Sequence, residues 1–168
     1  DSSATTIGFG AFKFTEKKEV KGGFLKFAVE NTKEDSLPFD VFNNATFSID
    51  VEGLDTKDAG RDFNVKSSLF AKMDSTKFIT GKVKSIEYIG DYANCNFIVS
   101  IKMNNVERED TLAASLENDQ LSLIGTINLN DFKAQKALAS LNKTCLELHR
   151  GSDGKSVTWP EVNIYVST

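Results

Sequence analysis

The sequence predicts a single, mainly β domain, an antiparallel β-barrel of about eight strands with one short and one longer α-helix. Apolar and polar residues alternate with a period of two in segments of about ten residues, and Gly, Asn or Asp clusters separate these segments. The length of 168 residues is typical of one domain with one core. Thirteen Phe against one Trp and three Tyr supply large apolar area with few polar groups, so the barrel interior can be wide and dry.

The N-terminal third of the chain is expected to form three strands. The first covers residues 5–13, a charged turn follows at 16–19, and the second strand starts after Gly22-Gly23, where a bulge or a glycine bend is expected. The third covers residues 45–54. Alternation gives these strands an apolar face made of Ile7, Phe9, Ala11, Phe24, Phe27, Phe47, Ile49 and Val51.

The apolar period changes in two segments, which predict the helices. Residues 56–69 suit a short helix, for which Thr56 and Asp58 are candidate N-caps. Residues 131–149 predict a longer amphipathic helix, because apolar residues recur there at spacings of four and three. We expect the longer helix to lie on the barrel.

The remaining strands are expected to form a meander of hairpins. Tight-turn dipeptides at Asn104-Asn105 and Asn118-Asp119 join three of these strands. The clearest alternation runs over residues 94–103 and includes Phe97, Val99 and Ile101. The expected strands in this part of the chain cover residues 78–88, 94–103, 106–117, 121–129 and 157–166.

Charge and composition exclude several classes of function. Acidic residues outnumber basic ones by 24 to 20, and without a basic stripe we expect no nucleic-acid partner. Every apolar stretch is well below the roughly 20 residues that cross a bilayer, so no membrane span is expected. The start at Asp1-Ser2-Ser3 would fit a mature chain whose export signal has been removed.

Few residues offer catalytic or metal chemistry. The one histidine, His149, is expected at the end of an exposed helix, and the chain has no Gly-x-Ser-x-Gly elbow. The segment from Gly151 to Ser156 has two residues between its glycines where a phosphate loop needs four, so a turn is favoured. Cys95 and Cys145 match no zinc pattern and are expected to be small buried hydrophobes, and their pairing as a disulfide stays open. We therefore expect no metal, no cofactor and no enzyme activity.

The apolar faces allow two interiors. A barrel of about eight strands is wide enough either to be filled by its own side chains or to enclose one slender ligand, and periodicity does not choose between them. Burial is worth about 0.8 kcal/mol per CH₂, so a chain of about 20 carbons offers a gross driving force above roughly 10 kcal/mol.

Several ordered segments resemble one family. They are Ile7 to Ala11, Gly22-Gly23-Phe24, Phe47-x-Ile49-x-Val51, Arg61-Asp62, Ser68-Leu69-Phe70, Phe78 to Lys82 and Asn130-Asp131-Phe132. On these residues the chain resembles the YceI family of lipocalin-like, polyisoprenoid-binding periplasmic proteins, from about residue 5 to 166. The resemblance implies an up-and-down barrel around an isoprenoid quinone, another prenyl lipid or a fatty acid or amide, with export across the inner membrane and no catalytic residues.

We therefore expect a periplasmic or secreted protein that carries or sequesters a long apolar lipid. Such a lipid, an isoprenoid or a long-chain acyl compound, is its expected ligand and partner. The alternative is a stress-response or interaction module with a packed core that acts as a homodimer; an enzyme acting on a bound lipid comes third. The residues expected to line the ligand site are Ile7, Phe9, Ala11, Phe24, Phe27, Phe47, Ile49, Val51, Leu69, Phe70, Phe78, Phe97, Val99, Ile101, Leu112 and Leu123.

Overall fold

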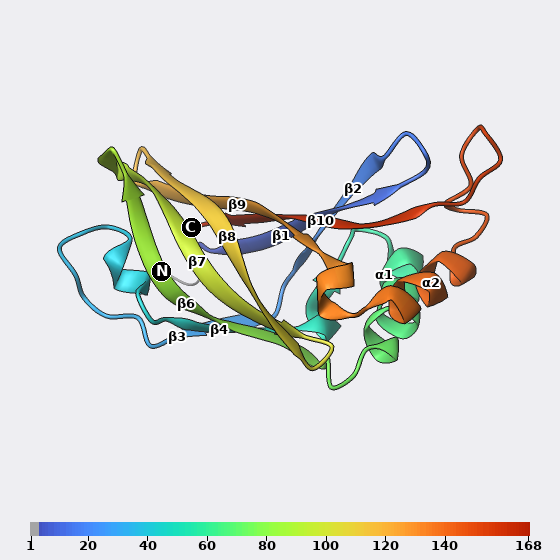
Figure 1. Ribbon diagram of the computed structural model, residues 1–168, viewed down its shortest axis with the longest axis horizontal. Helices are drawn as coiled ribbons and strands as arrows, with labels where there is room; N and C mark the ends of the chain where they lie inside the picture. Colours follow the sequence, from blue (N-terminus) through green and yellow to red (C-terminus); the bar gives the residue numbers. More distant parts are fainter. Residues whose placement is uncertain (1–3) are drawn as a thin grey trace.

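The computed structural model describes residues 4–168 as a curled antiparallel sheet with two α-helices at one end (Figure 1). Asp1 to Ser3, the start that would fit an exported mature chain, lie outside the described residues. The order of strands in the sheet is β3-β4-β6-β7-β8-β9-β10-β1-β2-β5. The strands are β1 Thr6–Lys13, β2 Lys18–Phe24, β3 Phe27–Glu30, β4 Thr46–Asp50, β5 Leu54–Asp55, β6 Phe78–Ile89, β7 Asp91–Met103, β8 Val106–Glu117, β9 Gln120–Asn128 and β10 Thr158–Ser167. The predicted mainly β class with two helices is confirmed.

The two ends of this strand order are joined through two interrupted strands. β2 and β3 belong to one stretch of chain, and β4 and β5 belong to another, and these two stretches pair along their length. The backbone N–H of Leu25 donates to the carbonyl of Gly53 (2.8 Å) and that of Asp50 donates to the carbonyl of Lys26 (2.9 Å), so pairing continues across both interruptions. Because β2 also pairs with β1 and β4 also pairs with β6, hydrogen bonding continues around the barrel.

The predicted bounds of two N-terminal strands are wrong for local reasons. The first turn lies earlier than residues 16–19, because Phe14 (φ 65°) and Lys17 (φ 58°) adopt left-handed backbone and the N–H of Lys17 donates to the carbonyl of Phe14. The predicted strand over 45–54 is interrupted by a 3₁₀ turn, Val51–Gly53, because the Asp50 side chain accepts a hydrogen bond from the N–H of Glu52 (3.0 Å).

The helices are shorter than predicted. α1 covers Ala59–Ser68, and Asp58 is its N-cap, since its carboxylate accepts a hydrogen bond from the N–H of Arg61 (2.9 Å). The predicted continuous helix over 131–149 is wrong at both ends: a 3₁₀ turn, Leu129–Phe132, comes first, and α2 covers only Gln135–Thr144. Lys133 lies between them with φ 54°, a left-handed backbone conformation that interrupts a right-handed helix. Within residues 4–168, no helix is long and apolar enough to cross a membrane.

The barrel is covered differently at its two ends (Figure 1). α1 and α2 lie at one end, beside the β1–β2 hairpin. At the other end, residues 31–45 form a loop that contains a short 3₁₀ helix, Asp40–Phe42. Phe39 anchors this loop, since its side chain is fully buried and its ring lies 5.9 Å from the rings of both Tyr88 and Phe97. The core therefore continues beneath the loop.

Gly81 in β6 gives a test of how tightly the wall is built. A Cβ at this position would collide with the Phe47 ring and with the carbonyl oxygen of Ser100. We expect Gly81→Ala to lower the free energy of unfolding by about 1–3 kcal/mol, as measured by urea denaturation. Gly60→Ala is the control, because a Cβ there meets only Asp58 Oδ1 at 3.4 Å in the first turn of α1. Alanine at that helical site should raise the free energy of unfolding by about 0.5–1 kcal/mol. Equal decreases in the free energy of unfolding for both variants would contradict the tight packing around Gly81.

Candidate functional site

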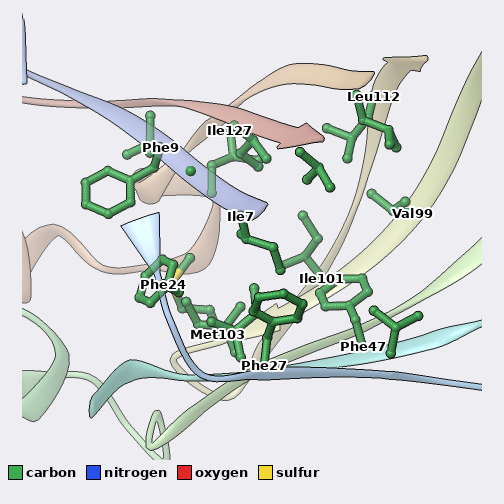
Figure 2. A pocket seen from close by; sticks show the side chains of 18 of the residues that line it. Ile7, Phe9, Phe24, Phe27, Phe47, Val99, Ile101, Met103, Leu112 and Ile127 are labelled. Carbon is green, nitrogen blue, oxygen red and sulfur yellow. The ribbon is translucent and has the colours of Figure 1, made fainter. Parts of the chain in front are cut away.

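The barrel encloses an apolar cavity of about 550 Å³. Its lining comes from nine of the ten strands, from both helices and from the 31–45 loop. Figure 2 shows side chains from β1, β2, β3, β4, β7, β8 and β9 pointing into one common space. The volume falls in the range of roughly 300–1,000 Å³ that small-molecule sites occupy.

Period-two alternation builds most of this wall. In β1, Ile7, Phe9 and Ala11 face inward, and in β7 the residues at 97, 99, 101 and 103 are all buried and inward. Aromatic rings extend the wall between elements, since the ring of Phe24 lies 5.6 Å from that of Phe9 and 6.3 Å from that of Phe70. The result is a continuous hydrocarbon surface.

The two ends of the cavity differ in polarity. Apolar side chains close the helical end; these are Val65, Leu69, Phe70, Leu138 and Leu141. Threonine hydroxyls and one lysine lie at the other end, from Thr5, Thr32, Lys33, Thr46 and Thr168. Three of these hydroxyls are already bonded, because Thr5 Oγ1 donates to Thr168 Oγ1 (2.7 Å) and Thr46 Oγ1 accepts from Asn31 (2.9 Å). Among the lining residues of the described chain, Lys33 is the one ionisable side chain.

Fourteen of the sixteen predicted site residues lie in the cavity wall. They are Ile7, Phe9, Ala11, Phe24, Phe27, Phe47, Ile49, Leu69, Phe70, Phe97, Val99, Ile101, Leu112 and Leu123. Their contact with a ligand stays a prediction.

The other two predicted residues, Phe78 and Val51, lie outside the wall. Phe78 is 43% exposed, because its neighbour Ile79 takes the inward position of β6 and pairs with Ile49. Val51 is buried outside the cavity, because the strand ends at Asp50 and the alternation ends with it.

Sequence reasoning missed other lining residues for different reasons. Val162, Ile164 and Val166 share one face of the expected last strand and could have been found from alternation. Val41 and Phe42 come from a loop without periodicity, so only the folded chain reveals them. Val65, Leu138 and Leu141 lie on helices whose docking site the pattern does not specify.

Reactive groups lie outside the cavity wall. His149 is half-buried and contacts the Thr158 hydroxyl through Nδ1, whereas the sequence placed it on an exposed helix end. Cys95 and Cys145 are both buried and free, which answers the open question of a disulfide. The described residues contain no group of three or more His, Cys, Asp or Glu that could hold a metal ion.

A curled antiparallel barrel around an apolar cavity, with helices at one end, is the class of protein that this fold and site define. The chain belongs to the YceI family, because the family model described as "YceI-like domain" matches residues 1–167. No relative is found among the curated proteins.

Three solved structures have similar folds. BcnA of Burkholderia cenocepacia is 17% identical, with a TM-score of 0.71 over 100% of this chain and 98% of that one. The YCEI protein of Campylobacter jejuni is 19% identical, with a TM-score of 0.66 over 90% and 84%. A polyisoprenoid binding domain from Saccharophagus degradans, implicated in plant cell wall breakdown, is 12% identical, with a TM-score of 0.67 over 97% and 91%. At these identities the likeness establishes the fold.

The two thiols give a test of core burial. Burial, followed by the nearby Asp40 carboxylate, raises the pKa of the Cys95 thiol to about 11, and burial also raises the pKa of Cys145. At pH 8 about one Cys95 in a thousand is therefore the reactive thiolate. We expect both cysteines to resist a thiol reagent such as DTNB at pH 8 in the folded protein and to react at once in urea. Fast modification of either cysteine without denaturant would contradict the buried placement.

Proposed function

We propose that this protein binds one long apolar lipid inside its barrel and carries or sequesters it without changing it chemically. The observation that carries the proposal is the cavity of about 550 Å³ with an almost wholly hydrocarbon wall. An apolar cavity of this kind stays dry, since water inside it would find too few polar partners. A hydrocarbon chain is the ligand that gains most from such a site.

The energetics favour a chain-like ligand. Each buried CH₂ contributes about 0.8 kcal/mol, and filling the void also restores dispersion contacts that its lining lacks. The apolar wall at the helical end suits a hydrocarbon chain, and the threonines and Lys33 at the other end suit a more polar group. The lining therefore favours amphiphiles with one extended apolar part.

Family membership supports the same class of ligand. The YceI family match covers nearly the whole chain, and one protein of similar fold is a polyisoprenoid binding domain from Saccharophagus degradans. We propose an isoprenoid quinone, another prenyl lipid, or a fatty acid or amide as the ligand. Family resemblance also motivates our proposal that the protein works in the periplasm or is secreted, and cell fractionation would check this location.

The competing hypotheses fit the cavity less well. A module with a packed core needs an interior filled by its own side chains, and a cavity of about 550 Å³ contradicts that. An enzyme acting on the lipid needs at least two titratable groups converging on it, and the described lining offers Lys33 alone. A homodimer stays a prediction that light scattering would check.

Lipid uptake by the purified protein tests the proposal. We expect mass spectrometry of an organic extract to detect a prenyl or long-chain acyl species. We also expect delipidated protein to take up a fluorescent long-chain fatty acid. An empty extract together with no uptake of added lipid would overturn the proposal.

A matched pair of arginine variants tests where the lipid binds. Phe97 is buried in the cavity wall, and Phe78 is exposed on β6 outside it. We expect Phe97→Arg to abolish uptake, because an unpaired charge enters a hydrocarbon site, and Phe78→Arg to retain it. Circular dichroism must confirm that both variants fold. If Phe97→Arg does not fold, Phe97→Ala, which enlarges the cavity without adding a charge, replaces it. Equal uptake by folded Phe97→Arg and by Phe78→Arg, or a lipid affinity unchanged by Phe97→Ala, would exclude the cavity as the lipid site.

A further inference from the structure

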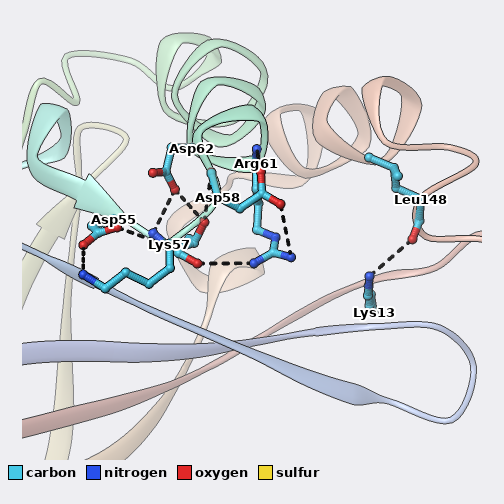
Figure 3. A network of polar contacts seen from close by, with 8 residues as sticks. Lys13, Asp55, Lys57, Asp58, Arg61, Asp62 and Leu148 are labelled. Carbon is cyan, nitrogen blue, oxygen red and sulfur yellow. Dashed lines mark hydrogen bonds and ion pairs between the residues drawn. The ribbon is translucent and has the colours of Figure 1, made fainter.

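Three basic side chains from distant parts of the chain gather beyond the helical end of the cavity. They are Lys13 at the end of β1, Arg61 in α1 and His149 after α2, and all three are half-buried. Lys13 Nζ donates a hydrogen bond to the carbonyl oxygen of Leu148 (3.4 Å), the residue before His149. Lys13 also lies opposite Thr158, past a shift in the β1–β10 register, and the Thr158 hydroxyl contacts His149 Nδ1. Figure 3 shows Lys13 reaching up from the hairpin and Arg61 reaching down from α1. We call these three residues the cationic cluster.

Two members of the cationic cluster extend faces that line the cavity. Lys13 follows the lining residue Ala11 by two positions, which is the same side of a β-strand. Arg61 precedes the lining residue Val65 by four positions, which is the same side of a helix. In both β1 and α1, therefore, the side that lines the cavity continues into a positively charged residue beyond the helical end.

His149 reaches the cluster from the face of α2 that lines the cavity. The backbone N–H of Cys145 donates to the carbonyl of Leu141 (2.9 Å), and that of His149 donates to the carbonyl of Cys145 (2.8 Å). Two successive helical steps thus lead from the lining residue Leu141 to the imidazole of His149. The imidazole, the third basic group, lies next to the same end of the cavity.

The positive charge of the cluster is poorly balanced. Within residues 4–168, neither Lys13 nor His149 has a carboxylate at ion-pair distance, and the Arg61 guanidinium lies 3.9 Å from an Asp58 carboxylate oxygen. That carboxylate also caps α1. The pKa of Lys13 is lowered mainly by burial, and further by the positive charges of Arg61 and Lys18. The pKa of His149 is also lowered mainly by burial, and further by the positive charges of Lys13 and Arg61. In both cases, neighbouring positive charges disfavour the protonated form of the group.

We propose that the cationic cluster binds an oxyanion, a phosphate or a carboxylate. Arginine, lysine and protonated histidine all donate charge-assisted hydrogen bonds, and the arginine fork matches two oxygens of such a group. The anion is a free ion such as phosphate, or the head group of a lipid that binds in the opposite sense to the one that the threonines and Lys33 favour, with its tail in the cavity and its head group past the apolar side chains of the helical end. The lipid source rests on the proposed function; the site itself does not.

The single histidine of the chain makes His149 a direct reporter of binding. The charged groups that act on it are Lys13 from the hairpin and Arg61 from α1. Lys18 and Cys145 lie near Lys13, and Asp58, the N-cap of α1, lies near Arg61. A bound anion stabilises the imidazolium, so it should raise the pKa of His149 from its lowered position. Proton NMR of the imidazole, followed over pH, measures that change with inorganic phosphate, dodecyl phosphate or uncharged dodecanol added to the full chain.

We expect dodecyl phosphate to bind about tenfold or more tightly than dodecanol, which is the scale of one charge-assisted hydrogen bond. Lys13→Gln and Arg61→Gln should each weaken the binding of the phosphate compounds by a similar factor and leave dodecanol binding unchanged. Lys84→Gln is the control, because it removes the same charge from an exposed position of β6. If Lys13→Gln does not fold, Arg61→Gln makes the same test.

The outcomes separate this site from the lipid cavity. Tighter binding of dodecyl phosphate than of inorganic phosphate assigns the site to a lipid head group, and equal binding with the same dependence on Lys13 assigns it to a free oxyanion. The proposal is overturned if neither phosphate compound raises the pKa of His149, or if the folded Lys13 and Arg61 variants bind both as the unaltered chain does. Dodecanol binding without any phosphate effect would retain the proposed function and exclude the oxyanion site; the reverse result would retain the site alone.

Discussion

Backbone pairing around the barrel is the constraint on which the rest of this structure depends. A closed ladder of hydrogen bonds fixes the circumference, and side chains fill only as much of the interior as their volumes allow. Here the ladder continues through the interrupted pair of strands, where Leu25 bonds to Gly53 and Asp50 bonds to Lys26. The apolar lining therefore cannot collapse to a packed core without breaking backbone hydrogen bonds, and a void of about 550 Å³ persists.

The same constraint explains the positions of some small residues. Gly81 leaves the room in which the Phe47 ring lies, and Gly22 leaves room for the ring of Phe9. Both phenylalanines line the cavity, so the missing side chains on the strands set where the rings stand. The shape of the cavity is thus encoded by glycine and phenylalanine together, and the many Phe residues of the composition have a definite use.

The sequence predicted the barrel and most of its wall because alternation is a local signal. In β7 the pattern continues without interruption, so Phe97, Val99 and Ile101 are placed correctly. It fails at Val51, where an Asp50 side chain ends the strand, and at Phe78, where two adjacent apolar residues compete for one inward position. The cationic cluster could not be predicted, because its members are brought together only when α1 packs against α2 and α2 packs against β10.

Stability and binding are linked in such a barrel. An empty apolar cavity leaves lining atoms without dispersion partners, so the unliganded protein is less stable than a packed barrel of the same length would be. A ligand that binds only the folded state recovers that loss by an amount that rises with the logarithm of its concentration relative to its Kd. A substitution that fills the void would raise the stability of the unliganded chain and reduce the space for a ligand. The void is therefore better understood as a structural requirement of binding than as a defect of packing, which agrees with a wall in which 14 of the predicted apolar residues face a common space.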